Sequence, residues 1–416
     1  MIKVLVLGGG REVGRSGFEI KVDNIKILLD YGIMIKENKP LFPLPTNAKD
    51  LDAIIITHAH LDHSGSAPMF YVSYSPKIYM TGITKELTDL LIRDLLHLSS
   101  YFLPFEVLEL KLMMNKTKVI KNELFIKELK IKAIKSGHIP GSISILIEHN
   151  GKKIWYSGDI NTRNTALLNK GEIPEEEIDL AIIESTYGLV DHPPREECER
   201  KLIEILNEVI EGGGRVLIPA FSVGRSQEIL CILQKYNFKY PIAIDGMSRT
   251  ATKIIANWPN EIKNPKLLRK AMSRAFWIKS QKDRNKVLEK PGVIITSSGF
   301  LTGGPSTYYM EFLKNRIEDC VILVSYQIPG TPGRILLDEK VYGPQKEKVK
   351  CRVEWIDFSS HCGRKELLEI VKSLKGNPKI LCVHGESDSC KGLVDQIKNE
   401  IGLEAIAPSM GESFTI

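Results

Sequence analysis

The sequence is poor in cysteine and has no paired cysteine motif. Seven of its 416 residues are cysteine, an odd number, and no two form a Cys-x-x-Cys pair. This pattern argues against a disulfide scaffold and a structural zinc ribbon, and it is typical of a reducing compartment. We therefore expect a cytoplasmic protein.

Long apolar runs are absent as well. No stretch approaches the roughly 20 apolar residues of a membrane-spanning helix. Residues 1–7 predict a strand that runs into glycines, not a signal peptide. The composition is ordinary for a globular protein, and the net charge of +6 permits a nucleic-acid partner without establishing one. We expect no membrane association.

The N-terminal glycines superficially suggest a dinucleotide-binding motif. Gly8 to Gly10 follow an apolar strand, and Asp30 lies about 20 residues further on. However, Val13 occupies the place of the third glycine, and the alternating segments 18–22 and 25–30 predict strands where that motif needs a helix. We therefore expect no nucleotide cofactor, and a turn at 8–17 that passes beneath a site.

The length and the pattern of elements predict two domains. A chain of 416 residues exceeds one ordinary core. Strands dominate before residue 188. Between 189 and 350, helices at 196–211, 226–236, 249–257 and 305–316 alternate with strands at 241–244, 292–296 and 320–324, as in a doubly wound parallel sheet. Strands that end in histidine return in 351–416. We expect one domain, 1–188 with 351–416, interrupted by a second at 189–350.

Residues 57–65 contain four candidate metal ligands within six positions: His58, His60, Asp62 and His63. They follow the apolar run 53–56, which predicts a buried strand. Side chains at alternating positions of an extended chain point the same way, so His58, His60 and Asp62 can converge while His63 serves a second ion. Imidazole and carboxylate suit zinc best, with manganese or iron as alternatives.

Histidine or acidic residues recur where other predicted strands end. Several such residues suggest that one edge of a sheet sandwich has been assembled into a site. These further candidates are Asp30, His138, Asp159, Glu184, His361 and His384.

Loops of the second region also suit anions. Hydroxyls, backbone donors and a cation placed ahead of a helix favour phosphate, and ligands bind at the carboxyl ends of parallel strands. The candidate phosphate-binding residues are Ser222, Arg225, Ser226, Ser298, Gly299, Ser306, Tyr326 and Gln327.

The pattern His58-x-His60-x-Asp62-His63, followed by His138 and Asp159, resembles the metallo-β-lactamase superfamily. Glu184 in Glu-Ser-Thr-Tyr-Gly, with His361 and His384, resembles the further motifs of its β-CASP nucleases. The run Glu-Val-Gly-Arg-Ser at 12–16 and Glu184 resemble the archaeal cleavage-and-polyadenylation-factor branch more closely than ribonuclease J. We expect the chain to lack the N-terminal KH-type extension of some archaeal relatives. The resemblance implies an α/β fold, an αββα sandwich with an inserted Rossmann-like β-CASP domain.

The resemblance also implies residue roles. His58, His60 and His138 would hold one zinc, Asp62, His63 and His384 the other, and Asp159 would bridge them, with Asp30 supporting the ligands. The expected cofactors are two zinc ions per subunit. The candidate catalytic residues are Asp62, Glu184 and His361, with His361 as the proton donor to the leaving oxygen.

We therefore expect a zinc-dependent ribonuclease that acts on single-stranded RNA, as an endonuclease, a 5′–3′ exonuclease or both, in RNA 3′-end processing or decay. A homodimer is expected from the resemblance. The alternatives are a DNA-processing nuclease of the same fold, a catalytically inactive RNA-binding scaffold, and a hydrolase of small molecules.

Overall fold

A computed structural model describes residues 2–36, 39–99 and 102–416. The chain forms two compact units. Unit 1 comprises the residues up to Asn164, Lys170–Asp191 and Ser360–Ile416, and unit 2 comprises Thr165–Asn169 and His192–Ser359. The divisions, after Asp191 and after Ser359, thus fall three and nine residues beyond the predicted boundaries at 188 and 350, and the segment Thr165–Asn169 joins unit 2.

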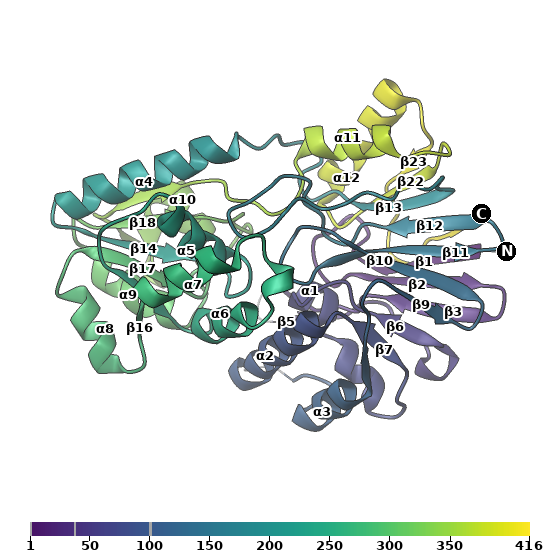
Figure 1. Ribbon diagram of the computed structural model, residues 1–416. Helices are drawn as coiled ribbons and strands as arrows, with labels where there is room; N and C mark the ends of the chain where they lie inside the picture. Colours follow the sequence, from purple (N-terminus) through teal and green to yellow (C-terminus); the bar gives the residue numbers. More distant parts are fainter. Residues whose placement is uncertain (1, 37–38, 100–101) are drawn as a thin grey trace. The chain divides into compact units, whose positions relative to one another are not determined.

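Unit 1 contains two seven-stranded sheets (Figure 1). In order across the first sheet, the strands are β24 (Ser413–Thr415), β1 (Ile2–Gly8), β2 (Gly17–Val22), β3 (Ile25–Leu29), β6 (Ala53–Ile55), β7 (Ile78–Met80) and β8 (Thr117–Val119). The second has β23 (Ala405–Ile406), β22 (Lys379–Val383), β13 (Leu180–Glu184), β12 (Lys152–Tyr156), β11 (Ile143–His149), β10 (Leu129–Lys135) and β9 (Glu123–Ile126). A separate hairpin pairs β4 (Met34–Lys36) with β5 (Lys39–Leu41).

The sheets of unit 1 are apolar on both faces. Alternate side chains of a strand point to opposite sides, and in these strands both sets are apolar. In β3, Ile27 and Leu29 join the core between the two sheets, whereas Leu28 joins the core under the helices. In β13, Ile182 faces the partner sheet and Ile183 faces the other way. A strand buried on both faces needs layers on both sides, which explains the helix–sheet–sheet–helix arrangement.

Helices cover the outer faces of both sheets (Figure 1). α2 (Gly82–Leu98) and α3 (Val107–Lys116) pack on the first sheet through residues such as Ile92 and Met113. α11 (Arg364–Ser373) and α12 (Ser387–Gln396) pack on the second through residues such as Leu367 and Leu393. The short α1 (Leu61–Ser64) lies directly in the predicted ligand motif. This layering agrees with the predicted αββα sandwich.

Unit 2 is built on a six-stranded sheet in which every strand pair is parallel. Its strands, in order, are β16 (Phe276–Trp277), β15 (Ile242–Asp245), β17 (Gly292–Thr296), β14 (Arg215–Pro219), β18 (Cys320–Leu323) and β21 (Arg352–Trp355). A short pair, β19 (Val341–Tyr342) and β20 (Glu347–Lys348), lies apart. The helices are α4 (Arg195–Glu211), α5 (Arg225–Lys235), α6 (Ser248–Ala256), α7 (Pro265–Arg274), α8 (Gln281–Leu288), α9 (Pro305–Leu313) and α10 (Pro332–Glu339).

Some sequence-based predictions need correction. The strand near 351 was assigned to the sandwich domain, but β21 pairs with β18 along its whole length and so belongs to the sheet of unit 2. Helices α3, α7, α8 and α10 were not predicted. The amphipathic pattern of residues 84–100 predicts a helix; in the structure α2 spans Gly82–Leu98, and residue 100 lies outside the described residues.

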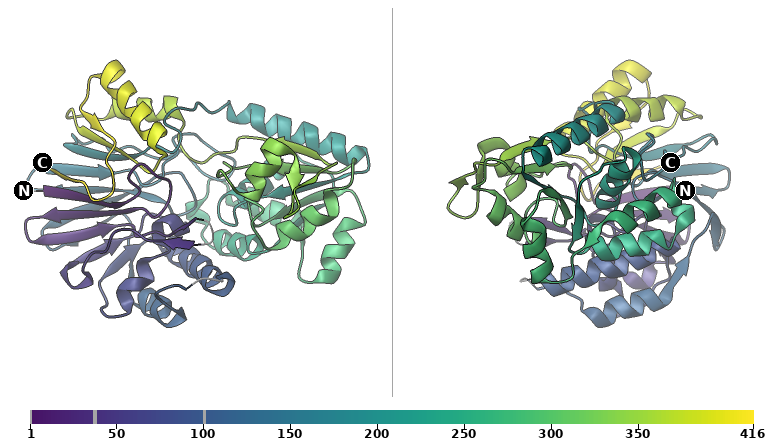
Figure 2. Two further views of the ribbon diagram at one scale, coloured as in Figure 1. Left: turned by 180° about the vertical axis from the view of Figure 1, so that it is seen from behind. Right: turned by 60° about the vertical axis from the view of Figure 1, so that its left-hand side comes forward.

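The two ends of the chain meet in unit 1. β24 pairs antiparallel with β1, and both views place the N- and C-termini side by side (Figure 2). The start of the chain is antiparallel, β1 with β2 and β2 with β3, as predicted in place of a dinucleotide-binding unit. Among the described residues, no helix combines the length and apolar character that a membrane span requires.

Candidate metal centre

The candidate ligands lie where strands of unit 1 end. β12, β13 and β22 are parallel neighbours, so their carboxyl ends share one edge of the second sheet. Asp159 follows β12, Glu184 ends β13, and His384 directly follows β22. In the first sheet, β6 ends at Ile55, and His58 and His60 occupy the loop before α1. The sandwich thus brings residues from distant parts of the sequence to one place.

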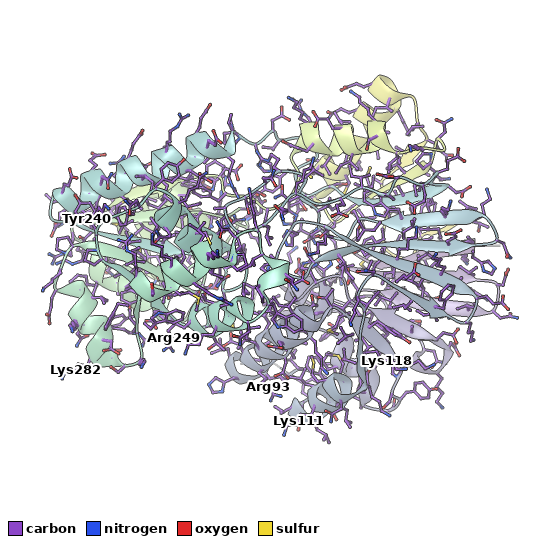
Figure 3. All side chains as sticks on the ribbon, in the orientation of Figure 1. Arg93, Lys111, Lys118, Tyr240, Arg249 and Lys282 are labelled. Atoms are coloured by element: carbon purple, nitrogen blue, oxygen red, sulfur yellow. The ribbon has the colours of Figure 1, made fainter. Side chains whose placement is uncertain are left out.

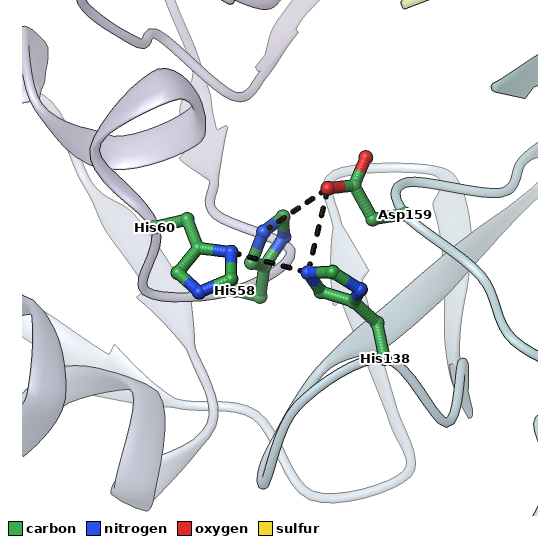
Figure 4. Close-up of side chains that lie close together, drawn as sticks. All are labelled: His58, His60, His138 and Asp159. Atoms are coloured by element: carbon green, nitrogen blue, oxygen red, sulfur yellow. Dashed lines mark hydrogen bonds and ion pairs between the residues drawn. The ribbon is translucent and has the colours of Figure 1, made fainter. Parts of the chain in front are cut away.

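Four of the predicted ligands form one group: His58, His60, His138 and Asp159 (Figure 4). Nε2 of His138 lies 3.1 Å from Nδ1 of His60, and Oδ2 of Asp159 lies 3.5 Å from Nε2 of both His58 and His138. Ligand atoms around a tetrahedral zinc with bonds near 2.05 Å are separated by about 3.4 Å. The spacing of this group therefore fits one zinc ion.

The remaining predicted ligands lie on the other side of Asp159. Nε2 of His63 is 3.2 Å from Nε2 of His384 and 3.2 Å from Oδ1 of Asp159. Oδ2 of Asp62 is 3.3 Å from Nε2 of His384 and 4.0 Å from Nε2 of His63. The two oxygens of Asp159 are thus directed at different groups, Oδ2 at the first and Oδ1 at the second. A carboxylate in this position can bridge two ions.

Hydrogen bonds from neighbouring residues fix which ring nitrogen faces the centre. Nδ1 of His63 donates to Asp30 at 2.8 Å, and Nδ1 of His138 donates to the carbonyl of Ser360 at 2.9 Å. Oγ1 of Thr57 contacts Nδ1 of His58 at 3.1 Å. These bonds leave Nε2 of each ring directed at the other ligands, as metal-binding histidines require.

Thr186 links the second group to Glu184 and His361. Its hydroxyl donates to Oε2 of Glu184 at 2.5 Å, so its lone pair is available to Nδ1 of His384 at 3.2 Å. Oε1 of Glu184 accepts from Nδ1 of His361 at 2.9 Å. Nε2 of His361 lies 3.9 Å from Asp159. Glu184 and His361 therefore form a hydrogen-bonded pair beside the ligands.

Burial and charge favour cation binding here. Burial lowers the pKa of His58 and of His138 well below the usual range, which keeps both rings neutral, the form that binds metal. Burial also opposes charge on His63, but the carboxylates of Asp159 and Asp30 outweigh it and raise the pKa of that ring. The carboxylates of Asp30, Asp159 and Glu184 are all buried here. Their negative charge attracts positive charge, which divalent cations would supply.

Unsatisfied polar atoms support the same reading. Within the described chain, Nε2 of the fully buried His58 and Oδ1 of the buried Asp159 have no hydrogen-bond partner. Buried polar atoms without a partner are rare and usually mark a missing water or ion. These two atoms belong to the ligand groups described above, and metal ions between the ligands would satisfy them.

His361 differs from the ligands in exposure. Its side chain is 20% exposed, whereas Glu184 behind it is 1% exposed. Burial disfavours the charged ring, but the carboxylates of Glu184 and Asp159 raise the pKa of His361 to about 9. These carboxylates therefore favour the protonated ring, and His361 is the more exposed member of the pair.

Several residues at this centre were not assigned roles from the sequence. Thr57, Tyr156 and Thr186 all hydrogen-bond to Asp30, Glu184 or a ligand. Thr57 and Thr186 lie inside the predicted motifs, so their positions could have suggested supporting roles. Tyr156 is the last residue of β12, three positions before Asp159. Strand alternation directs its side chain toward the core between the two sheets.

The predicted phosphate-binding residues all lie in unit 2. Ser226 and Ser306 are buried, and their hydroxyls donate within the loops, to the carbonyls of Phe221 and Gly303. The amide of the buried Gln327 donates to Gly299. Ser222 and Arg225 are also buried, Ser298 is half-buried, and Tyr326 is 37% exposed. Their binding to phosphate stays a prediction.

Family models match three successive parts of the chain. Residues 19–181 match the metallo-β-lactamase superfamily domain, residues 226–336 match the Beta-Casp domain, and residues 346–408 match the Zn-dependent metallo-hydrolase RNA specificity domain. The first and third matches contain all seven predicted metal ligands.

Curated relatives match over nearly the whole chain. RNase aCSPSF2 of Saccharolobus solfataricus is 40% identical over 99% of this chain and 85% of its own length. Probable RNase MJ4 of Methanocaldococcus jannaschii is 34% identical over the full length of both chains. Transcription termination factor FttA of the same organism is 34% identical over 98% of this chain and 70% of its own.

Among solved structures, a protein of unknown function from Enterococcus faecalis has a similar fold. The two chains superpose with a TM-score of 0.63 over the full length of each, at 14% sequence identity. This likeness concerns the fold alone.

Proposed function

This chain belongs to the β-CASP family of metallo-β-lactamase-fold hydrolases, in the archaeal cleavage-and-polyadenylation-specificity-factor branch, and from this premise we propose that it is a two-zinc ribonuclease that hydrolyses phosphodiester bonds of single-stranded RNA. The names of its relatives support RNA as the substrate. The fold family implies a bound metal. Zinc as that metal, and two ions per subunit, belong to the proposal.

One observation carries the proposal: the two oxygens of Asp159 are directed at separate ligand groups. His58, His60 and His138 would hold one ion, and Asp62, His63 and His384 would hold the other, with Asp159 shared. Neutral imidazoles and carboxylates at these spacings suit zinc. Two ions that shared this carboxylate would be able to act on the same phosphate.

The chain's own residues divide the work of hydrolysis. When bound, the two cations offset phosphate charge and lower the pKa of water to near neutrality. Asp62, whose side chain is 31% exposed, marks the open side of the ligand cluster. Water gives up a proton to solvent and adds to phosphorus as hydroxide, the bond from phosphorus to the 3′ oxygen breaks, and that oxygen takes a proton from His361, which regains one from solvent. Glu184 orients the His361 ring and stabilises its charge until the transfer.

The substitution of Asp62 and His63 by Ala tests the proposal. These changes remove two ligands of one group, so we expect loss of RNA cleavage and a lower zinc content in a protein that still folds. Circular dichroism checks the fold, and elemental analysis measures the metal. Full cleavage by this variant would refute the metal centre.

RNA and DNA strands of one sequence, digested side by side, test the substrate class. We expect cleavage of the RNA. Preferential cleavage of the DNA would favour the alternative of a DNA-processing nuclease, and binding of RNA without cleavage would favour the inactive scaffold. Product mapping with RNA blocked or unblocked at its 5′ end separates internal cutting from trimming. The homodimer and the cytoplasmic location stay predictions; sedimentation tests the first.

A further inference from the structure

Positive charge is concentrated in one segment of unit 2, residues 249–290. This basic segment has twelve Lys and Arg residues and three Asp and Glu residues, an excess of nine positive charges. The whole chain has a net charge of only +6, so the remainder is net negative. Crowded like charges repel one another and attract a polyanion. The segment includes α6, α7, β16 and α8.

Three of the four cations on α7 form no ion pair within the described chain. Lys266, Arg269 and Lys270 are exposed and pair with no described carboxylate, whereas Arg274 donates to the carbonyl of Phe238. Other exposed lysines do form ion pairs; Lys152, for example, lies 2.6 Å from Asp179. Lys266, Arg269 and Lys270 therefore remain available to a ligand.

A cavity of about 610 Å³ lies beside these cations, wholly within unit 2. Four of its lining residues are lysines: Lys235 on α5, Lys263 before α7, and Lys266 and Lys270 on α7. Lys266 and Lys270 are four residues apart, so they lie on the same face of the helix. The volume falls in the range of pockets that hold small ligands, roughly 300–1,000 Å³.

Gln234 supplies an independent sign of a ligand. It lines the same cavity and is only 7% exposed, yet its Oε1 has no hydrogen-bond partner within the described chain. A buried acceptor without a donor costs free energy, which a ligand with an O–H or N–H group would recover. The cavity thus offers cations for an anionic group and an acceptor for a nearby donor.

We propose that this cavity and α7 bind the ribose-phosphate backbone of single-stranded RNA, at a site separate from the metal centre. A ribonucleotide carries both required features, a phosphate for Lys266 and Lys270 and a 2′-hydroxyl donor for Gln234. The choice of RNA among polyanions rests on the proposed function. The site would hold RNA without taking part in cleavage.

The salt dependence of RNA binding tests the proposal. A Lys266→Ala, Lys270→Ala variant of the full chain is titrated with labelled 20-nucleotide RNA, with chelator present to prevent cleavage. Each lost phosphate contact should lower the slope of log Kd against log salt by about 0.7, or about 1.4 for the pair. Lys111→Ala with Lys118→Ala is the matched control, because both are exposed lysines of unit 1 without an ion-pair partner in the described chain (Figure 3).

We expect the control to keep the wild-type slope. Equal slopes in the two double variants would overturn the proposal. Hydrogen exchange provides a measurement without substitutions: RNA should protect residues 263–274 of the wild-type chain, and absence of protection there would also overturn it.

Two further measurements identify the ligand. Gln234→Met should weaken RNA binding and leave binding of DNA of the same sequence unchanged, because only RNA has the 2′-hydroxyl. A polyglutamate peptide that displaces RNA from the wild-type chain as well as unlabelled RNA does would overturn the choice of RNA. Because binding is measured without cleavage, an inactive metal centre would refute the proposed function and leave this result standing.

Discussion

The replacement of Asp30 by Asn isolates the support beneath the metal ligands. Asp30 is fully buried and has a left-handed backbone, with φ of 56°. Its Oδ1 accepts from the backbone N–H of Thr57 at 2.7 Å. Its Oδ2 accepts from Nδ1 of His63 and from the hydroxyl of Tyr156, both at 2.8 Å. The hydroxyl of Thr57 donates to the same carboxylate at 2.9 Å, so four donors converge on it.

Asn has nearly the same shape but replaces one acceptor oxygen with an N–H₂ donor. If that group takes the place of Oδ2, it faces the donors of His63 and Tyr156; if it takes the place of Oδ1, it faces the N–H of Thr57. Either orientation loses at least one bond and makes the others neutral. Hydrogen bonds to charged groups contribute about 1.5–3 kcal/mol and neutral bonds about 1 kcal/mol, so we expect the free energy of unfolding to fall by about 3 kcal/mol.

Metal affinity should fall in parallel, because the carboxylate no longer fixes the ring of His63. Loss of such a supporting partner typically weakens metal binding about 10- to 100-fold. Competition with a chromophoric chelator measures the affinity, and urea unfolding of the metal-free protein measures the stability. Asp319→Asn is the matched control: Asp319 is fully buried in unit 2 and accepts from the N–H of Arg215 at 2.8 Å. It should lose stability but keep metal affinity. Wild-type metal affinity in the Asp30 variant would refute this reasoning.

Three shorter predictions follow from the same centre and its core. Thr186→Val should weaken metal binding about 10-fold, because Val offers no acceptor to His384, and Thr186→Ser should restore it; chelator competition measures both. His361→Ala should slow RNA cleavage about 10²- to 10⁴-fold with unchanged metal content, whereas His97→Ala, on the exposed face of α2, should cleave normally. Ile182→Ala, between the two sheets of unit 1, should lower the free energy of unfolding by about 2–5 kcal/mol in urea, and a loss below 1 kcal/mol would contradict its place in the core.

The ligand set was accessible from the sequence because its chemistry is local. His58, His60, Asp62 and His63 follow one apolar strand, and the later ligands each follow another. Parallel neighbouring strands end at one edge of a sheet, as β12, β13 and β22 do here. Residues that follow such strands therefore lie close together, even when they are far apart in the sequence. The division of the ligands between two ions came from the family resemblance, and the orientation of Asp159 supports it.

Two of the missed helices bury few apolar side chains, so they offer little of the pattern on which such predictions rest. α7 buries only Leu268 and Ala271, and α8 buries only Leu288. Charged helices of this kind are held by tertiary contacts that the sequence does not display. The strand β21 was found but placed in the wrong domain, because strand pairing between distant segments leaves no local signal.

The order of the ligands along the chain constrains when the nuclease can become active. His384 follows β22, which pairs with β13 in the second sheet, and unit 2 separates these two strands in the sequence. During translation, a nascent chain therefore lacks one ligand until the ribosome has synthesised all of unit 2. An interrupted product that ends within unit 2 would have His58, His60, His63 and His138 but would lack His384, so one of the two sites would be incomplete. Such fragments should be unable to cut messenger RNA, including the transcript from which they are being made.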